Sequence, residues 1–194
     1  ENTLQKGYQP KDKESNNPLR IRFEQLKSLP KEGYTIQIEG AQVLIQASTS
    51  IGALYGANSF LAMLNPIIWK GGATSLTLPQ VQIEDAPAYG YRGLFLDVAR
   101  NFQSKEQVLK LLDLMSFYKL NVFHFNLAND EGWRIEIPGL PELTEFGGRR
   151  GFSADESEFL WPYYASGADP NQSTTGTGFY TASDFQEILT YAKD

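Results

Sequence analysis

The 194-residue sequence lacks cysteine altogether and contains one histidine, His124. Without cysteine the chain can form no disulfide, no thiolate metal site and no cysteine nucleophile. With one histidine it cannot build a multi-histidine metal site, and a Ser-His-Asp triad would have to use His124 itself. Several common kinds of catalytic centre are therefore excluded within this chain.

The sequence is also poor in positive charge and in long apolar segments. It carries 17 Lys and Arg against 23 Asp and Glu, a net charge of −6, and it has no run of basic residues. Because nucleic acids and anionic membrane surfaces require basic patches, we expect neither as a partner. The longest apolar candidate, Phe60 to Trp69, is interrupted by Asn65 and Pro66. It is shorter than the about 20 residues that span a bilayer, so we expect no transmembrane segment.

The remaining composition is typical of a globular protein, with 41% apolar and 21% charged residues. The chain begins at Glu1 rather than at Met, which favours a mature or trimmed end from which an export signal has been removed. We therefore expect an exported protein, whether periplasmic, secreted or on the cell surface. The polar residues 1–18 are expected to form a leader or a poorly ordered start.

The hydrophobic pattern of residues 19–87 predicts a small α+β domain. Apolar and polar residues alternate, as in half-buried strands, over residues 19–23, 34–38, 42–47 and 76–83. A helix is expected from about Ser50 to Leu64, where apolar residues recur at helical spacing after the capping candidates Ser48 and Thr49. Small residues in that helix, among them Gly52, would let it lie close to a sheet.

The pattern changes beyond Pro87, where we place a domain boundary because proline disfavours helix in the residue before it. Residues 88–194 predict an α/β arrangement, with buried strands at 92–98 and 121–127. A helix from Ser104 to about Tyr118 lies between them, and a strand-helix-strand unit of this length has parallel strands and a right-handed crossover. Residues 128–178 show no regular period and are interpreted as a long loop. A last helix is expected from Thr181 onward.

Polar side chains gather where these two strands end. Functional groups of parallel αβ barrels collect at the carboxyl ends of strands, and a set of polar residues falls there: Asp97, Arg100, Asn129, Asp130 and Glu131. They could equally form a polar rim whose members satisfy one another. Arg92 lies at the amino end of the first strand, where it could form a structural ion pair or hold vicinal sugar hydroxyls through its forked donors.

Individual residues in this region allow further expectations. Asp130 and Glu131 are adjacent, and neighbours in extended backbone point to opposite faces, so we expect Asp130 to face a pocket and Glu131 not to. His124, between two phenylalanines, is expected to be a hydrogen-bonded core residue. Trp133 is expected to pack in the fold, whereas Trp161 could pack or stack on a sugar.

Three blocks of this sequence together resemble the glycoside hydrolases of family 20, and most closely the bacterial chitobiase-like β-N-acetylhexosaminidases. They are YRGLFLDVAR from Tyr91, KLNVFHF from Lys119 and DEGWRIEIPGLPELTE from Asp130. Several linked blocks in order are more specific than one motif. The similarity covers residues 89–194, and residues 19–88 resemble more loosely the small domain that precedes the barrel in that family.

The resemblance implies a (β/α)₈ TIM barrel, of which this chain holds the first strands and helices. It also implies removal of terminal β-linked N-acetylglucosamine or N-acetylgalactosamine by a substrate-assisted, retaining mechanism, without metal or organic cofactor. The expected partners are an amino-sugar oligosaccharide or glycoconjugate and the remainder of the same polypeptide. A non-catalytic carbohydrate-binding or scaffold module derived from the family is the alternative, and a different αβ-barrel enzyme is a weaker one.

The same resemblance assigns roles to two residues, and a third follows from the local pattern. Arg92 matches the arginine that binds sugar hydroxyls at the non-reducing end, and Asp130 is expected to bind substrate because it is expected to face the pocket. Asn129 stands where relatives carry the first of two aspartates, which supports a histidine linked to the catalytic acid, and a neutral amide cannot stabilise an imidazolium as a carboxylate does. The family's catalytic Asp-Glu pair has no counterpart here, so the acid Glu and the acetamido-orienting Asp are expected beyond Asp194.

Overall fold

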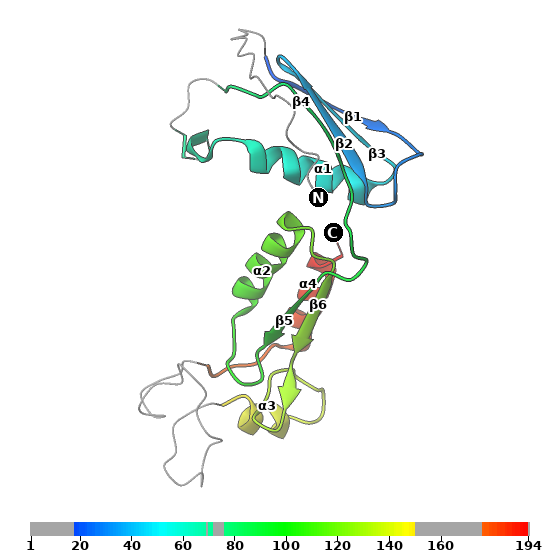
Figure 1. Ribbon diagram of the computed structural model, residues 1–194. Coiled ribbons are helices and arrows are strands. Elements are labelled where there is room, and N and C mark those ends of the chain that lie inside the picture. The colour runs from blue at the N-terminus through cyan, green and yellow to red at the C-terminus, as the bar shows by residue number, and fades with distance from the viewer. Residues whose placement is uncertain (1–17, 69, 72–75, 150–175, 194) are drawn as a thin grey trace, which may run out of the picture. The chain divides into compact units, whose positions relative to one another are not determined.

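The computed structural model describes residues 18–68, 70–71, 76–149 and 176–193 (Figure 1). The chain divides into two compact units between Gly90 and Tyr91. Each unit has its own cluster of buried apolar side chains. Trp161 and all of the expected leader, residues 1–18, except Pro18 lie outside the described residues.

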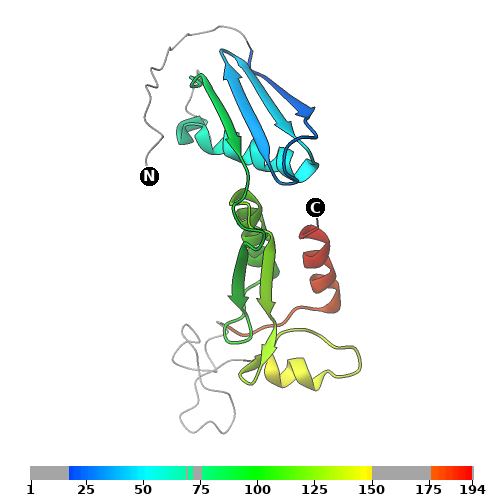
Figure 2. The same cartoon turned by 45° about the vertical axis from the view of Figure 1, so that its right-hand side comes forward.

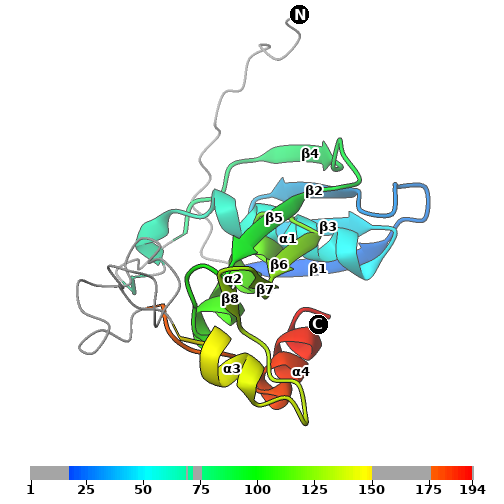
Figure 3. The same ribbon diagram turned by 90° about the horizontal axis from the view of Figure 1, so that it is seen from below.

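The first unit is a four-stranded sheet covered on one face by a helix (Figure 2). Its strands are β1 (Arg20–Gln25), β2 (Tyr34–Glu39), β3 (Gln42–Ala47) and β4 (Val81–Asp85), and their order β1-β3-β2-β4 can be followed in Figure 3. β1 pairs in parallel with β3, while β2 is antiparallel to both β3 and β4. A tight turn joins the antiparallel strands β2 and β3, with Gly40 at a positive φ of 60°.

The core of this unit follows from strict alternation along its central strands. Every second residue of β2 and β3 is buried toward the helix: Tyr34, Ile36, Ile38, Val43, Ile45 and Ala47. The helix is α1 (Ser50–Met63), and the hydroxyl of Thr49 caps it by accepting from the Gly52 amide at 3.2 Å. A 3₁₀ turn, η1 (Pro66–Ile68), follows. The predicted α+β arrangement is therefore confirmed for the described part of this unit.

The fourth strand is shorter than its sequence pattern suggested. Residues 76–80 are irregular and β4 begins only at Val81. Pro79 has no amide hydrogen to donate to the neighbouring strand, which explains why pairing starts after it.

The second unit begins with the predicted strand-helix-strand sequence. Its elements are β5 (Gly93–Asp97), α2 (Lys105–Phe117) and β6 (Val122–Asn126). β5 and β6 are parallel, with Gly93 opposite Val122 and Asp97 opposite Asn126, so the predicted parallel pairing is confirmed. α2 starts with a capping box formed by Ser104 and Gln107.

A second helix of this unit, α4 (Ala182–Tyr191), starts with a capping box in which Thr181 and Asp184 take part. Both helices contribute to one core, in which Val108 and Ile188 are buried together with Tyr180. The capping signals at residues 104 and 181 therefore predicted both helix starts correctly.

The expected loop after β6 contains regular structure that periodicity missed. β7 (Ala128–Asn129) and β8 (Gly132–Trp133) form a hairpin, and α3 (Glu142–Gly147) follows. Two-residue strands and a six-residue helix are too short to show a hydrophobic period. The hairpin turn consists of Asp130 and Glu131, so the expected extended backbone at these two residues was wrong.

Candidate functional site

The carboxyl ends of β5 and β6 carry a small ionic cluster. Asp97 is the last residue of β5, and its carboxylate accepts the Arg100 amide at 3.1 Å and also forms an ion pair with the Arg100 guanidinium. On its other side the Arg100 Nε lies 3.3 Å from a carboxylate oxygen of Glu131 in the hairpin turn. Arg100 therefore joins the strand end to the hairpin.

Asp97 is held in its charged form by its neighbours. Partial burial raises the pKa of Asp97, but hydrogen bonds from the Arg100 amide, the Arg100 guanidinium and Asn126 outweigh it and leave the pKa below its ordinary value. The cluster consequently carries a carboxylate at neutral pH. Three of the five polar residues predicted at this edge interact directly, since Arg100 contacts both Asp97 and Glu131. For these three residues the alternative of a polar rim whose members satisfy one another is confirmed.

Asn129, the last residue of β7, is held by one half of its amide. Its Oδ1 accepts the Glu131 amide at 2.8 Å, which ties the side chain across the hairpin turn. Its Nδ2 is buried and has no hydrogen-bond partner among the described residues. A buried amide donor without an acceptor costs about 1–3 kcal/mol, so Nδ2 is a candidate donor to a group outside the described residues.

Asp130 occupies the same turn and is exposed. Its negative charge raises the pKa of Arg100 only as a minor contribution beside that of Asp97. Glu131 is half-buried against Arg100. The Asp130 carboxylate is thus exposed while the Glu131 carboxylate contacts Arg100. This difference arises from the geometry of the turn and not from the alternation of side chains along a strand.

Arg92 lies at the opposite end of the strands. Its backbone amide donates to the Asn121 side chain at 3.0 Å, and its Nε donates to the Lys119 carbonyl at 2.7 Å. One of the five N–H donors of the guanidinium is thereby used to join the start of β5 to the start of β6. The described residues do not bring Arg92 together with Asn129 or Asp130.

His124 and Phe95 are both exposed, and their rings meet edge to face at 4.8 Å. The expectation that His124 is a core residue was therefore wrong for the part of the chain that is described. The apolar residues of β5 and β6 predicted buried strands. One face of the pair packs on the core cluster, through Leu94, Leu96, Phe123 and Phe125. The other face, which carries Phe95 and His124, is exposed. Trp133 behaves as expected, since its indole N–H donates to the Ile135 carbonyl at 2.6 Å.

Arg134 is a residue whose importance the sequence did not reveal. It directly follows β8, it has 0% exposure, and its guanidinium donates to the carbonyls of Ala99, Gly148 and Gly178. A lone arginine after a hairpin ordinarily suggests an exposed charge. The block in which it stands gave no other signal for this burial.

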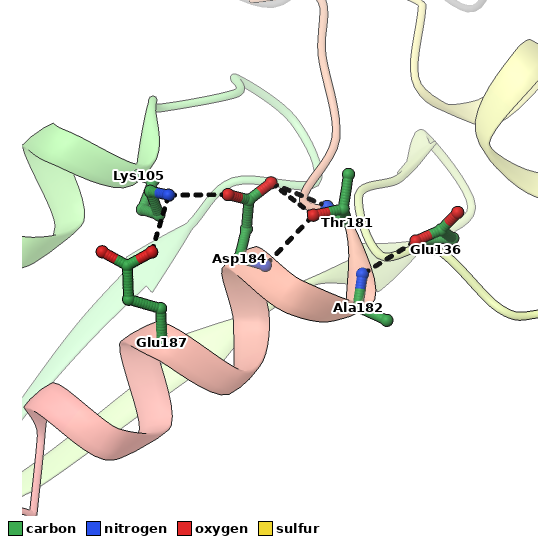
Figure 4. Close-up of polar contacts among 6 residues, drawn as sticks. All are labelled: Lys105, Glu136, Thr181, Ala182, Asp184 and Glu187. Carbon is green, nitrogen blue, oxygen red and sulfur yellow. Dashed lines mark hydrogen bonds and ion pairs between the residues drawn. The ribbon is translucent and has the colours of Figure 1, made fainter.

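α2 and α4 are joined by charges at the start of both helices (Figure 4). The Lys105 ammonium lies 2.8 Å from carboxylate oxygens of Asp184 and Glu187. Hydrogen bonds from Lys105 and Thr181 lower the pKa of Asp184 to about 2. Nearby, Glu136 accepts the Ala182 amide at 2.8 Å and so fixes the first turn of α4 to the segment after β8.

Other kinds of site find little support in the described residues. No group of three or more His, Cys, Asp or Glu that could hold a metal ion occurs among them. None of their helices is long and apolar enough to cross a membrane. A shallow groove on the open face of the first unit's sheet contains no predicted site residue: Arg20, Arg22, Gln37, Glu39, Gln42, Val43 and Leu44 line it.

Comparisons with known proteins agree with the division of the chain into two units. The family model described as glycosyl hydrolase family 20, catalytic domain, matches residues 89–194, and that of family 20, domain 2, matches residues 1–86. The N,N'-diacetylchitobiase of Vibrio harveyi is 43% identical over 85% of this chain and 18% of its own length. The β-hexosaminidase of Vibrio vulnificus is 40% identical over 90% of this chain and 20% of its own length.

Solved structures give the same result. An exo β-N-acetylglucosaminidase of this family from Vibrio harveyi, in complex with N-acetylglucosamine, superposes with a TM-score of 0.74 at 33% identity, over 90% of this chain and 25% of that one. A Streptomyces plicatus β-hexosaminidase superposes with a TM-score of 0.71 at 28% identity, over 93% and 32%. The chain spans about a fifth of the length of these curated relatives. It belongs to glycosyl hydrolase family 20, with part of the catalytic domain in residues 89–194.

Proposed function

We propose that this chain is part of a β-N-acetylhexosaminidase, which removes terminal β-linked N-acetylglucosamine or N-acetylgalactosamine. The observation that carries the proposal is the catalytic-domain match over residues 89–194, together with the parallel β5–β6 pair at its start. The relatives named above are hexosaminidases and a chitobiase. The fold itself hosts many reactions, so the family rather than the architecture gives the substrate class.

The proposed reaction uses the substrate as its own nucleophile. The 2-acetamido oxygen attacks the anomeric carbon, the glycosidic C–O bond breaks, and a Glu protonates the departing oxygen. Water then opens the oxazolinium-like intermediate, and the anomeric configuration is retained. The resemblance assigns the Glu and the Asp that orients the acetamido group to polypeptide beyond Asp194.

Within this chain we assign substrate binding to Arg92 and Asp130. Support for Arg92 is its matched position together with the forked donor geometry of a guanidinium, which suits a pair of neighbouring sugar hydroxyls. Support for Asp130 is its exposure in the turn beside the ionic cluster. Changing Arg92 to Lys keeps the charge but loses the fork, and should lower kcat/KM by about 10- to 100-fold. Near-native kinetics of this variant would argue against sugar binding by Arg92.

Asn129 is assigned a supporting role, and its unpartnered Nδ2 is the structural support. A neutral histidine nitrogen from a later strand would supply the missing acceptor. Asn129→Asp keeps the oxygen that accepts the Glu131 amide and replaces the donor by a second carboxylate oxygen. A carboxylate would stabilise the imidazolium, so the variant should raise activity or move the histidine-dependent limb of the pH profile upward by about 1–3 units. Unchanged activity and an unchanged pH profile would show that Asn129 does not support the histidine that is linked to the catalytic acid.

The proposal is tested with two substrates and the complete polypeptide that carries this chain. We expect hydrolysis of 4-nitrophenyl N-acetyl-β-glucosaminide with retained configuration. The matched 4-nitrophenyl β-glucoside lacks the acetamido nucleophile and should not be cleaved at a comparable rate. Sugar binding without hydrolysis of either substrate would instead favour a non-catalytic carbohydrate-binding module. Equal cleavage of both substrates would contradict the substrate-assisted mechanism.

A further inference from the structure

Arg134 is the most completely buried charged side chain among the described residues. Its Nε and Nη2 both donate to the Ala99 carbonyl, at 3.2 and 3.0 Å. Its Nη1 donates to the carbonyls of Gly148 at 2.5 Å and Gly178 at 3.1 Å. Burying a cation is costly unless its donors are satisfied, and here the guanidinium binds carbonyls from three separate segments.

Two of the atoms around Arg134 belong to the polar edge of the second unit. Ala99 lies in the turn between Asp97 and Arg100, which form the ionic cluster. The backbone amide of Arg134 itself donates to the Leu127 carbonyl at 2.9 Å, directly before the hairpin. Arg134 is therefore bonded at one end to the hairpin and at the other to the turn after β5.

Close packing of the backbones supports the same contact. A Cβ added at Gly132 would meet the Ala99 carbonyl oxygen, so this position of the hairpin tolerates no side chain while the turn stays where it is. Arg100 and Glu131 can reach each other only while these two turns remain in contact. The geometry needed for the Arg100–Glu131 pair thus depends on backbone positions that Arg134 fixes.

We propose that Arg134 is a positioning residue: it holds the turn at residues 97–100 against the hairpin at residues 128–133, and so sets the placement of Asn129 and Asp130. The effect of this positioning on catalysis rests on the proposed function. Lysine cannot replace Arg134, because one ammonium has no planar fork that reaches three carbonyls at once. Arg134 acts through the residues it places and does not itself touch the substrate.

A first experiment measures the positioning without any reaction. Hydrogen–deuterium exchange is followed in the complete polypeptide for the Arg100 and Glu131 amides, which donate to Asp97 and Asn129. Arg134→Lys should accelerate exchange in both turns together by about 10- to 100-fold, the loss expected for charge-assisted hydrogen bonds. Amides of α1 in the first unit serve as the internal reference. Exchange within about twofold of the wild type in both turns would overturn the proposal.

A second experiment links the positioning to catalysis. Kinetics with the aryl N-acetyl-β-glucosaminide are compared for Arg134→Lys, Glu131→Gln and the double variant. If both act on the same contact, the double variant should lose about as much kcat/KM as the worse single variant. Losses that multiply would mean that Arg134 acts only through general stability. The exposed Arg22, which pairs with Glu24 in the first unit, gives the matched control Arg22→Lys with unchanged kinetics.

The two experiments separate the possible failures. A wild-type protein that cleaves no aryl substrate contradicts the proposed function, and hydrogen exchange still decides the role of Arg134. Should Arg134→Lys lack a cooperative unfolding transition, Gly132→Ala replaces it, because a methyl group there must push the hairpin away from Ala99. Gly132→Ala should then show the same joint acceleration in the two turns, and normal exchange there would overturn the proposal.

Discussion

Gly52→Ala should destabilise α1, although alanine favours helix over glycine by about 1 kcal/mol. Gly52 is buried in the first turn of α1. A Cβ there would lie 2.5 Å from the Gly33 carbonyl oxygen and 3.2 Å from the Ala47 Cβ. The first of these atoms is backbone and cannot rotate away, so α1 itself must retreat from the sheet.

The size of the effect follows from what α1 buries. Tyr55 and Phe60 are 5% and 2% exposed, and burial of each such side chain contributes about 1.5–3 kcal/mol. A gap of about 0.5–1 Å forfeits about a quarter to a half of the dispersion contact. The loss is then about 2 kcal/mol, and after the gain in helix propensity a net destabilisation of about 1 kcal/mol remains.

Hydrogen–deuterium exchange of the α1 amides measures this effect locally, so the two units need not unfold together. We expect about fivefold faster exchange across α1 in Gly52→Ala. Leu54→Ala is the matched control, because Leu54 belongs to the same helix and is 44% exposed. It should change exchange by less than about twofold. Unchanged or slower exchange in Gly52→Ala would refute the argument that α1 needs small residues to lie on the sheet.

Two further predictions concern the second unit. The lowered pKa of Asp184 means that its pairing with Lys105 stabilises the fold above its ordinary pKa of 3.8, and that this stability is lost as the pH falls toward 2. The midpoint temperature of unfolding should therefore depend less on pH between pH 5 and pH 2 in Lys105→Met than in the wild type. Lys110→Met, at an exposed position, is the control and should behave as the wild type. The same pH dependence of the midpoint in both variants would contradict the pairing. Tyr180 is 1% exposed and donates to the Gln103 carbonyl at 2.5 Å, so Tyr180→Phe should cost about 1 kcal/mol in denaturant unfolding, and an unchanged midpoint would contradict the importance of this bond.

Periodicity and capping chemistry predicted most of the long elements. The alternation through Ile36 and Ile45 located β2 and β3, and the hydroxyls of Ser104 and Thr181 marked the starts of two helices. These signals depend only on residues near one another in the sequence, so they can be recognised without knowledge of the tertiary structure. The parallel pairing of β5 with β6 followed from the length of the crossover between them.

The candidate site was predicted less completely, since its contacts join residues far apart in the chain. Nothing near Arg134 in the sequence indicates that carbonyls of Ala99, Gly148 and Gly178 surround it. The hairpin that carries Asp130 has strands too short for a period. His124 was expected inside because its neighbours are apolar, but burial depends on what covers a face, which the strand's own sequence does not specify.

We propose that these 194 residues form part of a hexosaminidase catalytic domain and do not include its proton donor. The most direct test assays the purified chain, the remaining polypeptide and the two combined for hydrolysis of an aryl N-acetyl-β-glucosaminide. General acid catalysis needs a donor within hydrogen-bond reach of the leaving oxygen, and no carboxylate of this chain is assigned to that task. We predict no hydrolysis by the chain alone and hydrolysis when the parts are combined. Turnover by the chain alone would contradict the account and would make Asp130 or Glu131 the first candidates for the acid.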